Sequence, residues 1–350
     1  MRVAVVHNAV AADSPPDEQD VLSQVSAVQD ALEALGHEAW PLPCSLDLES
    51  VKARLEAERP DLVFNLVESL NGKGRLIHLF PAMLDSAGFP YTGSKTEAIW
   101  LTSHKVMAKE RLAAVGLPTP YWVGPDPAEL PPIHRPQKNT KGLRQTWIVK
   151  SLWEHASVGL EGASIIDAAS EGRVLNELRL RSPLLGGACF GEVFIEGREF
   201  NLSVLAGPGG PQVLPPAEIL FEGYGSRPRI VGYRAKWQED SYEYSHTPRR
   251  FDFGPDDLFL LSDLKDIAAR CWQLFALKGY ARIDFRVDEK GRPFILEINA
   301  NPCLSPDAGF AAATARQGMT IPQAIERILE DAAGCRPPSP QALSPIDSRR

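Results

Sequence analysis

The sequence predicts an α/β protein in which a small, doubly wound N-terminal domain precedes a region that contains a β-hairpin with one polar face. Two patterns carry this prediction. Short apolar runs alternate with segments of helical periodicity over residues 1–94, and residues 281–302 have the pattern of a hairpin with one apolar and one polar face. The chain has 350 residues, of which 44% are hydrophobic and 23% are charged, so it can form two or three folded domains.

The N-terminal segment, residues 1–94, has a β-α-β-α-β order. Strands are expected at residues 3–6, 39–42 and 61–66, and helices at residues 21–35, 48–58 and 77–87. This order predicts a small parallel sheet, and ligands of such sheets bind where the strands end. The loops at that edge hold these polar residues: His7, Asn8, Asp17, Glu18, Glu68 and residues 71–74.

The composition argues against several classes of protein. The net charge is −8 and no strongly basic run is present, so we expect no nucleic-acid partner. The five cysteines form no Cys-x-x-Cys pair and their number is odd, which argues against a disulfide framework and predicts a reducing, cytoplasmic location. No apolar run reaches the length of a membrane span, and the apolar N-terminal run is too short for a signal peptide.

The hairpin carries the main functional signal. Residues 288–291 form a favourable turn, and side chains two apart in a strand share a face. One face is expected to join the core through Ile283, Phe285, Val287, Phe294, Leu296 and Ile298. The other holds Arg282, Asp284, Glu297 and Asn299. Hard oxygen ligands beside a cation suit Mg²⁺ that bridges phosphate oxygens, and a half-buried sheet with a solvated polar face is the alternative interpretation.

The order Arg282-x-Asp284, then Glu297-x-Asn299-x-Asn301-Pro302, resembles the metal-binding end of the ATP-grasp superfamily, and within it the D-alanine–D-alanine ligase-like group. The resemblance extends over residues 2–332. It implies an α+β ATP-grasp architecture in which two lobes, residues 95–190 and 191–334, clasp ATP. Residues 125–144 are expected to be a loop and residues 335–350 a disordered tail, because both are rich in proline.

The resemblance also implies which residues bind the metal and the phosphates. Asp284, Glu297 and Asn299 would bind Mg²⁺, or Mn²⁺ in its place, and Arg282 would stabilise an oxyanion. The charge of the phosphates would be offset by Lys105, Lys150 and Lys236. Without the resemblance, each lysine has a simpler interpretation. Lys105 would lie on the solvated face of a helix that is expected to begin at residue 102, and Lys150 would end a strand that precedes an irregular turn.

Two further segments resemble nucleotide-binding parts of the family. The N–H groups of the loop of residues 154–159 would close over the terminal phosphates, and Ser157 in this loop would be a catalytic residue, as would Arg282 and Lys236. Residues 192–195 would contact adenine, with Glu192, Phe194 and Ile195 as the residues concerned, and Glu199 would bind the ribose hydroxyls. A hairpin with charged faces is the alternative interpretation of residues 192–200.

These features predict an ATP-dependent carboxylate–amine ligase that forms an amide or peptide bond through an acyl phosphate. Its substrates would be an amino acid or another small carboxylate and an amine, and a homodimer is one assembly that this prediction allows. Three alternatives remain open. They are a D-alanine–D-alanine ligase proper, an ATP-grasp kinase that stops at phosphoryl transfer to a hydroxyl, and a non-catalytic nucleotide-binding module.

Several residues differ from the family pattern where the substrates would lie. His7-Asn8 and Val67-Glu68 stand where the family has Gly-Gly and His-Gly pairs, and Ala156 and Trp237 stand in place of Ser and Tyr. Cys303 replaces a Gly whose N–H helps to stabilise the oxyanion in the family. Since polar contacts discriminate strongly between small substrates, we expect a substrate other than D-alanine to be preferred.

Overall fold

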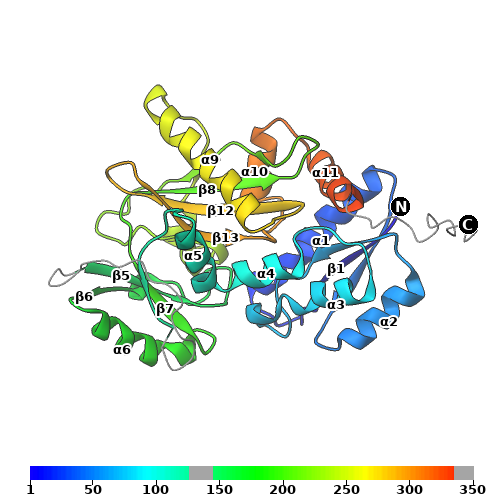
Figure 1. Ribbon diagram of the computed structural model, residues 1–350, viewed down its shortest axis with the longest axis horizontal. Coiled ribbons are helices and arrows are strands. Elements are labelled where there is room, and N and C mark those ends of the chain that lie inside the picture. Colours follow the sequence, from blue (N-terminus) through cyan, green and yellow to red (C-terminus); the bar gives the residue numbers. More distant parts are fainter. Residues whose placement is uncertain (126–144, 335–350) are drawn as a thin grey trace, which may run out of the picture.

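The computed structural model describes residues 1–125 and 145–334. The expected loop at 125–144, apart from Pro125, and the expected tail at 335–350 lie outside the described residues. Three sheets form three regions: the N-terminal region on one side of Figure 1, and two further regions stacked on the other side. The C-terminal helices return to the N-terminal region, so the two ends of the described chain lie near one another.

The predicted order of elements in the N-terminal region is confirmed. The strands are β1 (Arg2–Asn8), β2 (Glu38–Cys44) and β3 (Leu62–Leu66), and the helices are α1 (Pro16–Ala34), α2 (Leu48–Glu58) and α3 (Leu79–Ala87). The three strands are parallel in the order β2-β1-β3. All five residues of β3 are buried, as expected of a parallel strand that is covered on both faces.

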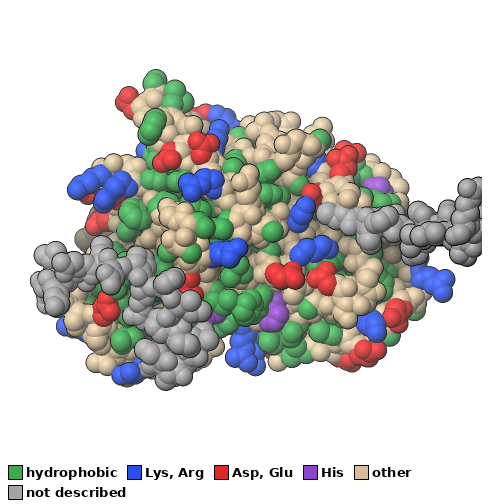
Figure 2. Space-filling view, viewed as in Figure 1, with side chains coloured by type: hydrophobic (Ala, Val, Ile, Leu, Met, Phe, Trp, Pro, Cys, Tyr) green, Lys and Arg blue, Asp and Glu red, His purple; other side chains and the backbone are tan. Residues whose placement is uncertain are grey.

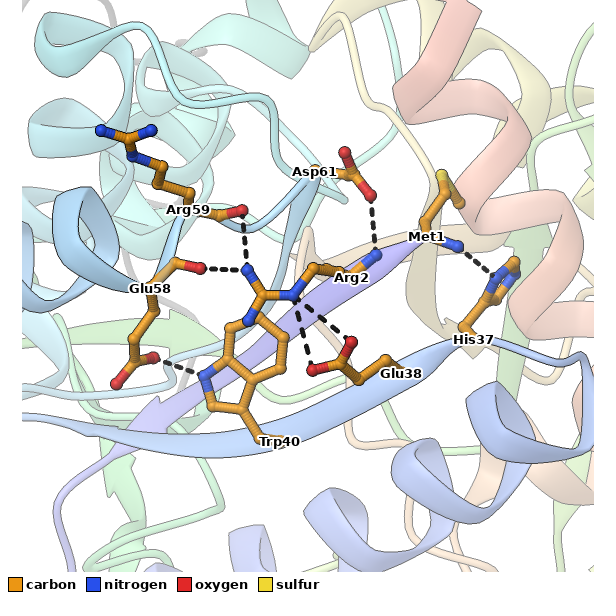
Figure 3. A network of polar contacts seen from close by, with 8 residues as sticks. All are labelled: Met1, Arg2, His37, Glu38, Trp40, Glu58, Arg59 and Asp61. Atoms are coloured by element: carbon orange, nitrogen blue, oxygen red, sulfur yellow. Dashed lines mark hydrogen bonds and ion pairs between the residues drawn. The ribbon is translucent and has the colours of Figure 1, made fainter.

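A polar network at the start of β1 ties this strand to its neighbours (Figure 3). The backbone N–H of Arg2 donates to Asp61 Oδ2 at 2.7 Å, and its guanidinium contacts Glu38 and the backbone oxygen of Glu58. The same guanidinium lies 5.0 Å from the ring centroid of Trp40. The network is exposed, so each ion pair adds little stability, but together the contacts fix the register of β1 against β2.

Two consecutive helices follow the N-terminal sheet. They are α4 (Thr96–Ser103) and α5 (Lys105–Ala114), and α4 did not stand out from the sequence. The expectation that one helix opens at residue 102 was wrong. Thr102 and Ser103 end α4, and the His104 side chain accepts a hydrogen bond from the backbone N–H of Met107, so it caps α5. Lys105 is therefore the first residue of its helix, and its side chain is buried.

The middle region is a four-stranded antiparallel sheet in the order β4-β7-β5-β6. Its elements are β4 (Trp122–Val123), β5 (Gln145–Ser151), β6 (Ile165–Ala168), α6 (Glu171–Arg181) and β7 (Cys189–Val193). The expected boundary between residues 190 and 191 falls inside β7, all of which belongs to this sheet. We therefore propose that the division between the two lobes lies after Val193.

The third region is a larger antiparallel sheet in the order β11-β10-β8-β12-β13, with β9 paired to β8. Its strands are β8 (Arg198–Leu205), β9 (Gln212–Val213), β10 (Ala217–Ile219), β11 (Arg249–Arg250), β12 (Tyr280–Val287) and β13 (Pro293–Asn299). Gly197, with φ +138°, immediately precedes β8, and a Cβ there would lie 2.1 Å from the backbone oxygen of Val287. This close approach requires glycine.

The predicted hairpin is present as β12 and β13, with Arg282 opposite Asn299 and Asp284 opposite Glu297. The expected apolar row on β13 was wrong in part, because a β-bulge shifts the register after Asp284. The extra residue is Leu296, which turns toward the polar side, and Ile295 is fully buried instead. Ile283, Phe285, Val287 and Ile298 are buried as expected.

The remaining α-helices belong to this part of the chain, and the last three of them contact its sheet. They are α7 (Tyr233–Trp237), α8 (Tyr242–Ser245), α9 (Leu258–Leu274), α10 (Gly309–Arg316) and α11 (Ile321–Gly334). In α11, Ile325, Ile328 and Leu329 join the apolar cluster formed by β1 and α1. Acidic and basic side chains are interspersed on the face that Figure 2 shows. Within the described ranges, each helix is too short or too polar to span a bilayer.

Candidate active site

One cavity of about 600 Å³ lies between the middle sheet and the C-terminal sheet, and the N-terminal region contributes to its wall. Its lining residues come from sequence segments far apart in the chain. The structure brings together in this cavity every residue that the sequence singled out for chemistry: Lys105, Lys150, Ser157, Glu192, Phe194, Ile195, Glu199, Lys236, Arg282, Asp284, Glu297 and Asn299. The predicted residues therefore form one site.

Glu297 lies at the electrostatic centre of the cavity. Burial alone would raise the pKa of its carboxyl, but Lys105, Lys236, Lys150 and Arg282 together hold that pKa well below its usual range. These four cations come from α5, α7, β5 and β12. A carboxylate that stays ionised among several cations, with room for a ligand beside it, is suited to a metal ion and a polyanion that bind together.

Asp284 is held by four hydrogen bonds from three side chains. Arg282 donates from Nε and Nη2 at 2.8 and 2.9 Å, Asn201 donates from Nδ2 at 2.7 Å, and Asn299 donates from Nδ2 at 3.1 Å. The amide of Asn299 is thereby oriented so that its Oδ1 is the atom that it can offer to a cation. Asn201 was missed from the sequence, and it lies opposite Asp284 on the neighbouring strand β8.

The donor set fits Mg²⁺ that binds together with phosphates. No group of three or more His, Cys, Asp or Glu side chains is placed to hold a metal ion within residues 1–125 and 145–334. Asp284 and Glu297 are two carboxylates on paired strands, and Asn299 adds an amide oxygen. Mg²⁺ is commonly held by one or two carboxylates, with waters and substrate phosphates completing its shell, so this set suits a metal–nucleotide complex.

Lys150 is fixed by a buried ion pair. Its Nζ lies 2.6 Å from Glu192 Oε1, and Lys109 Nζ lies 2.5 Å from Glu192 Oε2. Glu192 and Lys109 are each only 1% exposed. Burial would raise the pKa of Glu192, but the two lysines lower it, so the carboxylate stays ionised. Lys109 was missed from the sequence, although it lies one helical turn after Lys105 on the same face of α5.

The expected adenine segment leads from β7 into β8. The backbone N–H groups of Val193 and Phe194 donate to Tyr121 and Thr146. Ile195 is the next residue, and no backbone oxygen within the described ranges accepts its N–H. The contact of this segment with adenine stays a prediction.

Glu199 is paired with a residue that the sequence analysis did not single out. Arg286 Nη2 lies 3.0 Å from Glu199 Oε2, and its guanidinium lies 5.3 Å from the ring centroids of Phe194 and Phe221. Burial raises the pKa of Glu199, and Arg286 opposes this rise. The signal for Arg286 was present, because Arg282, Asp284 and Arg286 alternate on one face of β12.

The loop of residues 154–159 closes one end of the cavity. Ala156 and Ser157 both have positive φ, at 58° and 60°, which is uncommon for residues with a side chain. Lys105 Nζ donates to the backbone oxygen of Glu154 at 2.7 Å, and Ser157 Oγ donates to the backbone oxygen of Val231 at 3.0 Å. The loop is thus tied to α5 on one side and to the segment before α7 on the other.

A polar network lines the N-terminal end of the cavity. Gln24 donates to Glu68 at 2.9 Å and accepts from the backbone N–H of Leu304 at 3.0 Å. Cys303 Sγ donates to Asp20 Oδ2 at 3.0 Å. Burial, with a smaller contribution from the charge of Asp20, raises the pKa of Glu68 to about 7, although the Gln24 hydrogen bond opposes the shift. This end of the cavity therefore presents carboxylates.

The residues that differ from the family pattern do not all contact the cavity. Glu68, Ala156, Trp237 and Cys303 line it. Asn8 lines a neighbouring cavity of about 740 Å³ beside the same loop. His7, however, is a buried residue of β1 whose Nδ1 lies 2.9 Å from the backbone oxygen of Asn8. It lines neither of these two cavities, and the expectation that His7 borders a substrate stays a prediction.

Comparisons with known proteins agree with this geometry. A family model described as "D-ala D-ala ligase C-terminus" matches residues 112–330. A D-alanine–D-alanine ligase from Moorella thermoacetica is 30% identical over 343 residues, which cover 92% of this chain and 97% of the relative. Another, from Aquifex aeolicus, is 28% identical over 303 residues, which cover 87% of this chain and 92% of the relative.

Solved structures support the fold. A D-alanine–D-alanine ligase from Bacillus anthracis complexed with ATP has a TM-score of 0.65 and 17% identity, with 96% of this chain and 98% of that chain covered. D-alanyl-alanine synthetase A from Vibrio cholerae has a TM-score of 0.69 and 15% identity, with 95% of this chain and 98% of that chain covered. These likenesses confirm the predicted α/β fold class.

The first prediction concerns Lys150. Lys150→Met keeps most of the side-chain volume and removes the charge, so we expect ATP to bind about 10- to 100-fold more weakly and AMP less than about threefold more weakly. Isothermal titration calorimetry with both nucleotides checks this. Lys265→Met, on the exposed side of α9, is the matched control. Equal weakening of ATP and AMP binding in Lys150→Met would contradict a contact of Lys150 with the phosphates that AMP lacks.

The second prediction concerns the pH dependence of stability. Because the pKa of Glu68 is raised in the folded state, its protonated form is favoured there, and stability is lost as pH rises toward and through about 7. The unfolding free energy of the wild type should fall by about 1–3 kcal/mol more between pH 5 and pH 8 than that of Glu68→Gln. Urea denaturation of both proteins, with the exposed Glu33→Gln as control, measures this difference. An equal fall in both proteins would show that Glu68 ionises normally.

Proposed function

The chain belongs to the D-alanine–D-alanine ligase family of ATP-dependent carboxylate–amine ligases, and on this basis we propose that it joins an amino acid or another small carboxylate to an amine, with a pair other than two D-alanines preferred. The observation that carries the proposal is the single cavity in which Glu297 lies among Lys105, Lys150, Lys236 and Arg282. That charge pattern suits the triphosphate of a nucleotide and a reaction that moves its terminal phosphoryl group.

In the proposed reaction, a substrate carboxylate oxygen attacks the γ-phosphorus of ATP. The bond to the β,γ-bridging oxygen breaks, so ADP leaves and an acyl phosphate forms. Lys105 and Lys150 would hold the phosphates that remain on ADP, and Lys236 would stay with the transferred group. All three lysines lie in the cavity wall, and Glu192 keeps Lys150 oriented from behind. Positioning and charge compensation would therefore supply most of the catalysis in this step.

In the second step, the amine attacks the acyl carbon and inorganic phosphate leaves, with loss of a proton from the amine nitrogen. The negative charge that develops on the acyl oxygen would be stabilised by Arg282. Two of the three guanidinium nitrogens of Arg282 are bonded to Asp284, which leaves Nη1 for this oxygen. The backbone N–H of Cys303, which lines the same cavity, would be a second donor.

A divalent cation would complete the site. Asp284, Glu297 and Asn299 would hold Mg²⁺ or Mn²⁺, which would offset the charge on the transferred phosphoryl group. ATP itself would lie with its adenine beside Phe194 and Ile195 and its ribose near Glu199. A requirement for ATP fits a cytoplasmic location.

The substrate end of the cavity supports the choice of an ammonium-bearing acyl donor. Asp20 and Glu68 line this end, and Gln24 connects it to the segment that follows β13. A substrate ammonium would compensate the negative charge of these half-buried carboxylates. Since Glu68 lies where the family has a small or neutral residue, its charge and size would alter which side chain is accepted.

The third prediction tests the metal and phosphate site. Glu297→Gln keeps the shape of the side chain but removes the charge, so we expect ATP turnover to fall about 10²- to 10³-fold. Phosphate release with saturating ATP and Mg²⁺ measures this change. Glu289→Gln, an exposed residue in the turn of the same hairpin, should retain activity. Full turnover in Glu297→Gln, with intact folding by circular dichroism, would exclude the assigned role.

The fourth prediction concerns substrate choice. Because Glu68, Ala156 and Trp237 change the polar contacts and the volume of the cavity, D-alanine should be a poor substrate compared with at least one other amino acid. Steady-state phosphate release, with products identified by mass spectrometry, should be measured for D-alanine and a panel of L- and D-amino acids. D-alanyl-D-alanine synthesis that is more efficient than every other pair would show that these substitutions are neutral.

A further inference from the structure

Lys236 is carried by α7, a helix of five residues, Tyr233–Trp237. So short a helix is unstable by itself, because the cost of its first turn is not repaid by further hydrogen bonds. The position of the Lys236 ammonium therefore depends on how the neighbouring residues of α7 are held. Residues four apart on a helix share a face, so Tyr233 and Trp237 can anchor the two ends of α7 on one side.

The two ends of α7 are anchored to different parts of the molecule. Tyr233 Oη donates to Asp17 Oδ1 at 2.7 Å, and Asp17 lies in the first turn of α1 in the N-terminal region. Trp237 Nε1 donates to the backbone oxygen of Ala156 at 3.0 Å. The family pattern has Ser where this chain has Ala156. The contact with Trp237 does not need that hydroxyl, because the acceptor is the backbone oxygen of Ala156. Lys236 lies between these two anchors.

We propose that Tyr233 and Asp17 form a clasp through which the N-terminal region positions Lys236 at the phosphate end of the cavity. The proposal rests on the proposed function for the role of Lys236, and it goes beyond that function by assigning two positioning residues. Asp17 and Tyr233 are 216 residues apart in the sequence, and both border the second cavity, beside the loop of residues 154–159. Through this clasp, the end of the molecule that would receive the substrate ammonium would also determine whether the phosphate end is assembled.

Hydrogen exchange measured by mass spectrometry tests the clasp without any substrate. In Tyr233→Phe, which loses one hydroxyl, the backbone amides of residues 233–238 should exchange about tenfold faster than in the wild type. Asp17→Ala should have the same effect. The double variant should exchange no faster than either single variant, because both substitutions remove one interaction. Unchanged exchange in Tyr233→Phe, or effects that simply add, would overturn the proposal.

A matched control separates the clasp from a general loss of stability. Tyr91 Oη donates to Asp85 Oδ1 at 2.8 Å, which is the same type of bond within the N-terminal region alone. Tyr91→Phe should leave the exchange of residues 233–238 unchanged. Asp17→Asn loses the charge but retains an acceptor oxygen for the Tyr233 hydroxyl, so residues 233–238 should exchange at nearly the wild-type rate. Exchange as fast as in Asp17→Ala would show that the charge of Asp17, and not the hydrogen bond, is what matters, and would overturn the clasp.

Steady-state kinetics give a second readout. If the clasp positions Lys236 for phosphoryl transfer, Tyr233→Phe should lower kcat about tenfold and change the KM for ATP less than about threefold. A rise in KM with unchanged kcat would overturn the positioning role. The proposed function is tested separately, with the wild type only, by measuring whether phosphate release requires both a carboxylate and an amine. The exchange experiment needs no turnover, so either proposal can fail while the other stands.

Discussion

The charge balance around Glu297 is the constraint on which the rest of the site depends. Lys105, Lys150, Lys236 and Arg282 reach one cavity from four different elements, and all four lower the pKa of this one carboxyl. Bringing four cations together is unfavourable unless anions compensate them. Glu297 supplies part of that compensation in the protein, and a nucleotide triphosphate would supply the rest. Glu192 and Asp284 also pair with two of these cations, so a bound nucleotide would add to a charge balance that the fold already provides in part.

Other charged and polar residues hold the side chains that line the cavity in position. Glu192 holds Lys150 and is itself balanced by Lys109, while Arg286 holds Glu199. Asp284 is fixed by Arg282, Asn201 and Asn299. In each case a buried charge is paired, which avoids the large cost of an isolated ion, and the pairing restricts the side chain to one direction. Long, flexible lysines and arginines are placed accurately in this way.

The sequence predicted local elements and single-strand patterns well. The N-terminal order of strands and helices, the turn at residues 288–291 and the polar face of the hairpin all follow from short-range periodicity, and they are confirmed. The bulge at Leu296 could not be predicted from the alternation of apolar and polar residues. One extra residue in a strand moves the following side chains to the opposite face of the sheet, and the amino-acid composition of the strand gives no sign of it. Asn201 and Tyr233 were missed, because their partners Asp284 and Asp17 are distant in the sequence and only the folded topology brings them together.

The packing of α11 bears on how this protein could be divided. Ile325, Ile328 and Leu329 complete the apolar cluster beneath β1 and α1, so the last helix of the described chain belongs physically to the first region. A continuous segment that ends near residue 94 lacks part of its own core. An exchange of substrate-binding regions between relatives would therefore have to move two separate segments, the first 94 residues together with α10 and α11. In this sense the proposed substrate region is a discontinuous module, completed by helices that follow the hairpin proposed to bind the metal.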